Sequence, residues 1–298
     1  MKIEKLYPSF KDYLWGGEKL KTDYNKDTDK DVVAESWELS FHEDGLTRLE
    51  NGKTLAETAE KEDLGANCEK YPFFPVMIKF IDAKGDLSIQ VHPSDEYALK
   101  HENSFGKTEM WYIVQADKGA GIYLGFKQDV TKEQVLKAID NNSLTDLLNF
   151  YEVKSGECYY IPAGTVHAIC KGCLICEIQQ NSNLTYRLYD YGRRDKNGKL
   201  RELHIDKSLD VMNLRKFSPL VKKGDFEIAN KYFTVHKKTV DGEMKLHTDA
   251  SSFKCVTITK GDGTIDGRPF IQGDSFFVPA NYGGFVLRGA FDAIITGA

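Results

Sequence analysis

The chain has 298 residues, of which 41% are hydrophobic and 29% charged, a composition typical of a soluble globular protein with one large or two smaller domains. Its 40 basic and 45 acidic residues give a formal net charge of −5, so no overall positive field favours nucleic acid or an anionic membrane. The N-terminal residues lack the apolar core of a signal peptide, and no run approaches the roughly 18 apolar residues of a membrane span, so we expect a cytoplasmic protein.

A lysine interrupts the first strongly apolar run, which reads Val-Met-Ile-Lys-Phe-Ile over residues 76–81. A charge inside an apolar strand costs free energy unless it is paired or reaches a ligand. Lys79 is therefore a candidate for binding a ligand.

The segment 87–92 alternates strictly between apolar and polar residues. Because successive side chains of a strand point to opposite faces, Ser88, Gln90 and His92 share one face. Pro93 lacks an amide hydrogen and should end the strand, which leaves His92 at its rim.

A second pair of candidates precedes the apolar run 110–114. Lys107 and Glu109 are two residues apart, so on a strand they point to the same side. We expect the Lys107 ammonium to point into the cavity that Glu109 faces; the alternative is a solvated lysine at a strand edge.

Most of the remaining segments are short, aromatic or β-branched and punctuated by glycine, such as 121–125 and 252–259, which predicts an all-β protein. Helical periodicity appears in 131–139, where Thr131 and Gln134 resemble a capping box. We expect two further helices at about 143–149 and 205–214, and a linker near 215–224.

An eight-residue pattern occurs twice in the chain. Residues 156–163 return at 273–280, position for position at an offset of 117, with glycine, an acidic residue, a short apolar strand and Pro-Ala. This predicts an internal duplication of a β-barrel or sandwich. At the same offset His167 falls on Gly284, so we expect the second copy to lack a metal site.

Three cysteines at 170, 173 and 176 have a spacing that invites a metal or iron–sulfur interpretation. Such sites usually need a fourth thiolate or histidine, which no nearby cysteine supplies, and in the hairpin expected at 168–178 Cys173 and Cys176 point to opposite faces. We interpret them as small strand residues without a metal or redox role.

His167 follows the turn-rich residues Pro162, Ala163 and Gly164, so it too lies at a strand end. Together with Gln90, His92 and Glu109 it offers two imidazoles, a carboxamide and a carboxylate, which suit a zinc-like divalent ion. The alternative is that each is an ordinary polar residue at a strand edge.

Two further charged residues follow in the strands 173–178 and 184–190. Arg187 is flanked by aromatic residues and can grip a phosphate with two parallel hydrogen bonds, or else form a core salt bridge with Asp190. Glu177 shares a face with Ile175 and Gln179, and is either an active-site acid or a structural partner of Arg187.

The motifs at 87–93, 107–110 and 162–168, together with Arg187, resemble those of the type I mannose-6-phosphate isomerases in their short bacterial form, a family of zinc-dependent cupin enzymes. The resemblance implies one Zn²⁺ per chain, an active-site acid and residues that contact the sugar phosphate. The implied ligands are Gln90, His92, Glu109 and His167, the acid is Glu177, and the substrate contacts are Lys79, Lys107 and Arg187, to which we add Ser88. Arg187, Glu177 and Lys107 are then the candidate catalytic residues.

The same resemblance implies two cupin-type β-barrels (jelly rolls): a catalytic domain at 1–217 with a short helical insert at about 128–149, and a metal-free domain at 218–298. The large helical domain of the longer enzymes is missing. The implied reaction interconverts mannose 6-phosphate and fructose 6-phosphate through an enediolate, and which residue is the base stays open. The alternatives are a cupin dioxygenase, which commonly uses iron without a Gln ligand, and a non-enzymatic sugar-binding or regulatory cupin.

Overall fold

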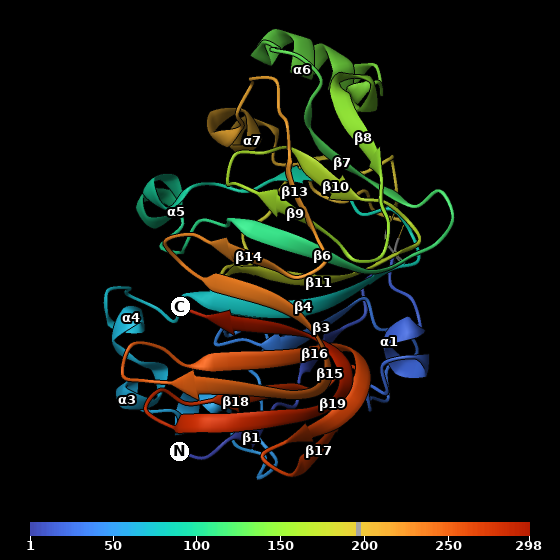
Figure 1. Ribbon diagram of the computed structural model, residues 1–298. Coiled ribbons are helices and arrows are strands. Elements are labelled where there is room, and N and C mark those ends of the chain that lie inside the picture. The colour runs from blue at the N-terminus through green and yellow to red at the C-terminus, as the bar shows by residue number, and fades with distance from the viewer. Residues whose placement is uncertain (195–197) are drawn as a thin grey trace. The chain divides into compact units, whose positions relative to one another are not determined.

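Strands dominate the protein, whose computed structural model describes residues 1–194 and 198–298 (Figure 1). The helices are α1 (Lys19–Thr22), α2 (Leu55–Thr58), α3 (Lys61–Leu64), α4 (Ala66–Glu69), α5 (Asp95–His101), α6 (Lys132–Asp140) and α7 (Ile205–Val211), with a 3₁₀ helix η1 (Leu144–Leu147). The strands are β1 (Glu4–Lys5), β2 (Ser9–Lys11), β3 (Glu35–Leu39), β4 (Val76–Ala83), β5 (Ile89–Val91), β6 (Glu109–Ala116), β7 (Gly121–Phe126), β8 (Leu148–Glu152), β9 (Glu157–Ile161), β10 (His167–Ile169), β11 (Cys173–Gln180), β12 (Tyr186–Tyr189), β13 (Leu220–Lys223), β14 (Phe226–Ala229), β15 (Thr234–Thr248), β16 (Lys254–Ile265), β17 (Arg268–Ile271), β18 (Ser275–Val278) and β19 (Gly283–Gly297). The predicted predominance of strands is confirmed, and none of the helices in the described residues is long and apolar enough to cross a membrane.

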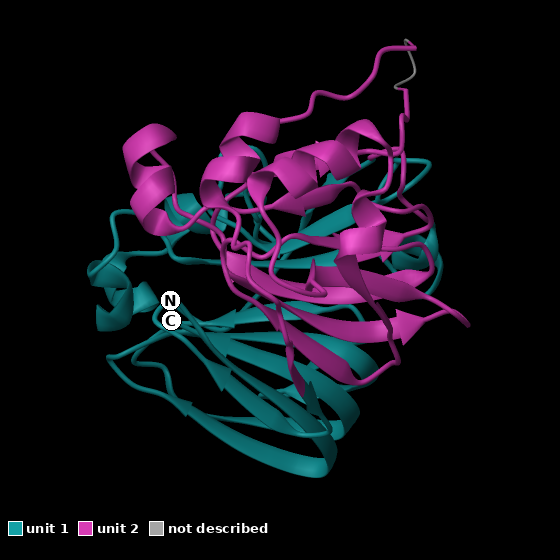
Figure 2. Cartoon of the chain, turned by 90° about the horizontal axis from the view of Figure 1, so that it is seen from above, with its two compact units in different colours: residues 1–12, 18–80, 222–298 teal, residues 13–17, 81–221 magenta. Residues whose placement is uncertain are grey.

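The chain forms two compact units, which Figure 2 colours separately. Unit 1 comprises residues 1–12, 18–80 and 222–298, and unit 2 comprises residues 13–17 and 81–221. The division into domains at 217/218 stays a prediction.

Unit 1 contains a sheet with the strand order β1-β18-β16-β19-β15-β14, in which β17 also pairs with β16. Three long strands form its centre, and Figure 1 shows them curving along their length. Glycines face one another across these strands, because Gly289 of β19 is opposite Gly242 of β15 and Gly263 of β16. A Cβ atom on Gly289 would lie 2.3 Å from the Asp262 carbonyl oxygen, so only glycine allows the backbones this close approach.

Unit 2 contains the five-stranded sheet β12-β5-β10-β7-β8 and the neighbouring strands β9-β6-β11. Strand alternation decides which side chains line the interior between them. In β5, Ile89 and Val91 belong to a hydrophobic cluster that also contains Val135 of α6 and Leu209 of α7. The helices therefore cover one face of the five-stranded sheet, and Gln90 is directed to the opposite face.

The helical insert is present but shorter than expected. Helix α6 begins after Thr131, whose side chain and that of Gln134 form the predicted capping box. The expected helix at 143–149 is the 3₁₀ helix η1, and strand β8 begins at Leu148. The expected helix at 205–214 ends at Val211 as α7.

The repeated segments form equivalent turns and strands. Gly156 and Gly273 have φ angles of 88° and 93°, and the strands β9 and β18 follow them. In the first copy the Glu157 carboxylate accepts a hydrogen bond from the amide of Lys154, and in the second the Asp274 carboxylate accepts one from the amide of Ile271, three residues upstream in both cases. The duplication of a whole domain stays a prediction.

Two expectations about strand pairing are wrong. The sheets are open rather than closed into barrels: in the described part of unit 1, for example, β1 and β14 are edge strands. Two sheets that face each other bury their apolar side chains without a ladder joining their edges. The expected hairpin at 168–178 does not pair with itself either, because β10 joins β5 and β7 whereas β11 pairs with β6.

Candidate functional site

The side chains of His92, Glu109 and His167 converge in the interior of unit 2. Their ligand atoms lie within 4.8 Å of one another, and all three residues are buried. The two oxygens of Glu109 face different imidazoles: Oε2 lies 3.5 Å from Nε2 of His92 and Oε1 lies 3.4 Å from Nε2 of His167. Among the described residues this is the group of histidine, cysteine and carboxylate side chains that could hold a metal ion.

Strand register brings Gln90 to the same group. Gln90 of β5 is opposite His167 of β10, and the Nε2 atoms of the two side chains lie 3.3 Å apart. His92 follows β5 directly, and its position two residues after Gln90 keeps both side chains on one face. The four predicted metal ligands therefore meet in one place.

Backbone carbonyls fix the tautomers of both histidines. Nδ1 of His92 lies 2.8 Å from the carbonyl oxygen of Leu184, and Nδ1 of His167 lies 2.8 Å from that of Thr165. Each Nδ1 therefore donates its hydrogen to a carbonyl, and each Nε2 faces Glu109. Burial lowers the pKa of His167 to about 4, so its imidazole is neutral at pH 7. Two imidazoles held at Nδ1 by backbone carbonyls, together with a carboxylate and a carboxamide, are a donor set that fits a divalent ion such as zinc.

Lys107 and Glu177 lie beside the metal-ligand group. Nζ of Lys107 is 3.4 Å from Oε2 of Glu109 and 3.8 Å from Oε1 of Glu177. Lys107 is 5% exposed and Glu177 is 3% exposed, so these charges interact where water screens them little. The prediction that the Lys107 ammonium points toward Glu109 is confirmed, and the solvated strand-edge interpretation is wrong.

Trp111 is a member of this cluster that the sequence interpretation missed. Its indole Nε1 donates a hydrogen bond of 2.8 Å to Oε2 of Glu177, and its ring meets the His167 ring edge-on, with centroids 5.3 Å apart. The sequence spacing indicates this position, because Trp111 follows Glu109 by two residues and so shares its strand face. Its position within a long apolar run made a core role the simpler interpretation.

Arg187 lies on β12 opposite Gln90 of β5. Its Nε donates to Oγ of Ser88 and its Nη1 donates to the carbonyl oxygen of Glu202. Burial and the nearby charge of Arg201 lower the pKa of Arg187. Ser88 and Arg187 are thus in contact, on the sheet face that also carries Gln90.

Asp190, the suggested salt-bridge partner of Arg187, pairs with other arginines. Asp190 is buried and pairs with Arg193 and with Arg201, whose Nη1 is 3.4 Å from the Asp190 carboxylate. Glu177, the other suggested partner of Arg187, accepts a hydrogen bond from Trp111 and lies near Lys107. Arg187 lies close enough to Asp190, Arg193 and Arg201 for their charges to interact.

Lys79 belongs to unit 1, and its neighbours there are acidic and aromatic. Its Nζ lies 3.3 Å from Oε2 of Glu35 and 4.6 Å from the ring centroid of Trp37. Trp37 also donates its indole hydrogen to Glu35. The buried charge of Lys79 is thus paired, as its apolar surroundings require.

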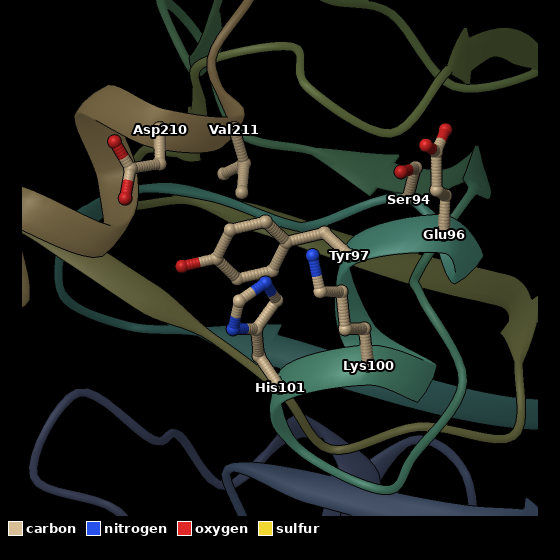
Figure 3. A pocket seen from close by; sticks show the side chains of 7 residues that line it. All are labelled: Ser94, Glu96, Tyr97, Lys100, His101, Asp210 and Val211. Atoms are coloured by element: carbon tan, nitrogen blue, oxygen red, sulfur yellow. The ribbon is translucent and has the colours of Figure 1, made fainter.

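A pocket with a volume of about 330 Å³ lies elsewhere in unit 2, between α5 and the end of α7 (Figure 3). Figure 3 shows Tyr97, Lys100 and His101 on α5 and Val211 on α7 around it. The rings of Tyr97 and His101 stack with centroids 4.3 Å apart. None of the predicted ligands or substrate contacts is among the residues that line this pocket.

All six cysteines are buried and none forms a disulfide, including Cys170, Cys173 and Cys176. Burial raises the pKa of Cys170 to about 12, so its thiol is protonated at pH 7. Cys173 and Cys176 are completely buried in β11. This agrees with a packing role for these cysteines.

Two family models match the chain. Residues 3–121 match the model "Phosphomannose isomerase type I, catalytic domain", and residues 222–296 match "Mannose-6-phosphate isomerase, cupin domain". The curated protein "Mannose-6-phosphate isomerase ManA" of Bacillus subtilis (strain 168) is 37% identical over 99% of each chain. The "Mannose-6-phosphate isomerase" of Streptococcus mutans serotype c is also 37% identical, over 95% of this chain and 94% of its own length.

Solved structures agree with these matches. The crystal structure of the mannose 6-phosphate isomerase from Bacillus subtilis superposes with a TM-score of 0.89 and 33% identity, covering 99% of both chains. The apo form of the mannose 6-phosphate isomerase from Salmonella typhimurium has a TM-score of 0.77 at 16% identity over 99% of both chains, which shows a shared fold. With its full-length relatives, its cupin-type sheets and its buried His–Glu–His group, the chain belongs to the type I phosphomannose isomerase family.

Proposed function

We propose that this protein interconverts mannose 6-phosphate and fructose 6-phosphate, using one bound zinc ion. The observation that carries the proposal is the buried group of His92, Glu109 and His167, joined by Gln90 and next to the pair Lys107–Glu177. The names of the full-length relatives support the choice of substrate. The alternation of β5 and the register with β10 supply the reason why these residues meet.

The donor set suits an ion that must stabilise negative charge. Gln90 is neutral and Glu109 contributes the one formal negative charge of the four proposed ligands, so a divalent ion keeps net positive charge. When bound, such an ion supplies electrostatic stabilisation to the oxygens of an enediolate.

We assign the proton transfer to Glu177. An aldose–ketose isomerisation removes a proton from the carbon beside the carbonyl and returns it to the neighbouring carbon, so one carboxylate can serve both steps. Oε2 of Glu177 is held by Trp111, and Oε1 is directed toward Lys107. The adjacent Lys107 ammonium places a positive charge beside this carboxylate.

We assign binding of the phosphate and sugar oxygens to Arg187, Lys107, Ser88 and Lys79. Arg187 contacts Ser88 and is half-buried, which suits a charge-assisted contact with an anion. Such a contact, remote from the reacting carbons, supplies binding energy that orients them. For Lys79 the support is the resemblance to the family rather than its contacts within unit 1.

The test is a coupled assay of mannose 6-phosphate conversion with metal-stripped protein and with the same protein after addition of zinc. We expect activity to disappear on stripping and return with zinc, without nicotinamide, nucleotide or oxygen. Stripped protein that stays fully active would contradict the metal requirement. Zinc-loaded protein that cannot convert either sugar phosphate, but consumes oxygen with another substrate, would favour the dioxygenase alternative. Sugar phosphate binding without any turnover would favour a binding protein.

A further inference from the structure

The indole of Trp111 and the carboxylate of Glu177 form a hydrogen bond that is shielded from water. The donor–acceptor distance is 2.8 Å, and the two residues are 1% and 3% exposed. They are opposite each other in the antiparallel pair β6–β11, so the backbone ladder itself holds the two side chains together. This bond does not depend on a flexible loop.

The second oxygen of the same carboxylate points elsewhere. Oε1 of Glu177 lies 3.8 Å from Nζ of Lys107, which in turn lies 3.4 Å from Oε2 of Glu109. Rotation about the last bond of a glutamate side chain is soft, with a broad two-fold preference. A donor at Oε2 and a cation near Oε1 together fix the plane of the carboxylate.

The same indole also contacts the metal-ligand group. Its ring meets the ring of His167 at an interplanar angle of 80° with centroids 5.3 Å apart, the edge-to-face arrangement that aromatic pairs prefer. Because Nδ1 of His167 is also held by the Thr165 carbonyl, the two contacts together fix the orientation of this imidazole ring. Trp111 thus touches the proposed proton carrier and one proposed metal ligand.

We propose that Trp111 is a positioning residue for the isomerase reaction, which holds the Glu177 carboxylate in the plane needed to reach two adjacent carbons of the substrate. This inference rests on the proposed function, in which Glu177 carries the proton. Proton transfer to neighbouring carbons by one group requires that the oxygen carrying the proton be placed within hydrogen-bond distance of both. A carboxylate free to rotate would meet this condition only part of the time.

The first experiment compares Trp111→Phe with the wild type. Phenylalanine keeps an aromatic ring and removes the N–H donor. We expect kcat to fall about ten- to a hundredfold, with KM within about twofold and with unchanged metal content. The matched control is Tyr159→Phe, which removes a buried aromatic donor from another carboxylate, Oε2 of Glu157, on the neighbouring strand β9. The control should keep kcat within about twofold.

A second substitution separates positioning from packing. Replacing Trp111 by β-(3-benzothienyl)alanine puts sulfur in place of N–H and retains the outline of the ring, so it tests the hydrogen bond even where Trp111→Phe disturbs the fold. We expect the same fall in kcat from this replacement. Full kcat in the folded benzothienyl protein would overturn the inference.

The third experiment is a double-mutant cycle with Glu177→Gln. If Trp111 acts through Glu177, adding Trp111→Phe to Glu177→Gln lowers kcat by less than about twofold more, whereas independent roles give losses that multiply. Multiplying losses would overturn the positioning role and leave the isomerase function standing. Full activity of Glu177→Gln would overturn the assignment of proton transfer to Glu177 as well. A wild type without isomerase activity would refute the proposed function itself.

Discussion

Gln90 and His167 are opposite each other in the antiparallel pair β5–β10, and their side-chain Nε2 atoms lie 3.3 Å apart. Seventy-seven positions of sequence separate them. A shift of register by one residue would turn one of the two side chains to the other face of the sheet, among the apolar residues that pack against α6 and α7. The arrangement of the metal-ligand group therefore depends on the register of this short strand pair.

His167→Ala should lose bound metal, because it removes one of two imidazoles whose Nε2 atoms face Glu109. Loss of a ligand from a four-ligand site typically lowers affinity by orders of magnitude, so we expect little metal after dialysis. Elemental analysis of the purified variant measures this. The control is His236→Ala, since His236 lies in unit 1 and pairs with Glu227. Full metal occupancy in His167→Ala would refute the site.

Arg187→Ala should lower kcat/KM for mannose 6-phosphate about ten- to a hundredfold, which corresponds to loss of a charge-assisted contact of about 1.5–3 kcal/mol. Metal content should not change, because Arg187 contacts Ser88 rather than the proposed ligands. Steady-state kinetics and elemental analysis of the same preparation provide both readouts. Arg215→Ala, which removes an exposed partner of Asp129, should retain wild-type kinetics. Unaltered kinetics in folded Arg187→Ala would make Arg187 a structural residue.

We expect one metal ion per chain, with none bound by residues 218–298. The repeat places Gly284 where the first copy has His167, and the residue opposite Gly284 in β15 is His247. A single histidine does not make a site, so His247→Ala should keep the full metal content of the wild type. Metal stoichiometry and a crystal structure of zinc-loaded protein check this. A second occupied site in this segment would contradict the prediction.

Gly289→Ala should destabilise the protein by about 2–4 kcal/mol, because the new Cβ would lie 2.3 Å from a backbone oxygen and the φ angle of 142° is one that side chains rarely adopt. Gly284→Ala is the matched control on the same strand, since its Cβ would meet only the Leu246 carbonyl at 4.0 Å. We expect the control to lie within about 0.5 kcal/mol of the wild type. Urea unfolding of both variants gives the comparison, and equal stabilities would show that the glycine contact does not constrain the sheet.

Local patterns in the sequence predicted local features well. The capping box at Thr131 and the turns before β9 and β18 depend on residues within four positions of each other, and they form as expected. The shared face of Gln90 and His92 follows from strand geometry alone.

Partners distant in sequence were harder to predict. A Lys-Gly turn after Cys170 indicates that the chain reverses, but it does not indicate that β10 and β11 enter different sheets. Trp111 was missed for a similar reason, because its role depends on the opposite strand placing Glu177 at its indole. Closure of a barrel likewise depends on which edge strands meet, and no single segment encodes that.

The proposed reaction centre is assembled from two layers of unit 2. Gln90, His167 and Arg187 come from the five-stranded sheet, whereas Glu109 and Glu177 come from β6 and β11. The spacing of the layers therefore sets the distance between the imidazoles and the carboxylates. Substitutions that enlarge side chains between the layers would move the two layers apart. They would separate the proposed proton carrier from the proposed metal ligands without altering any of these residues. The catalytic rate should therefore respond to changes in interior packing more strongly than the melting temperature does.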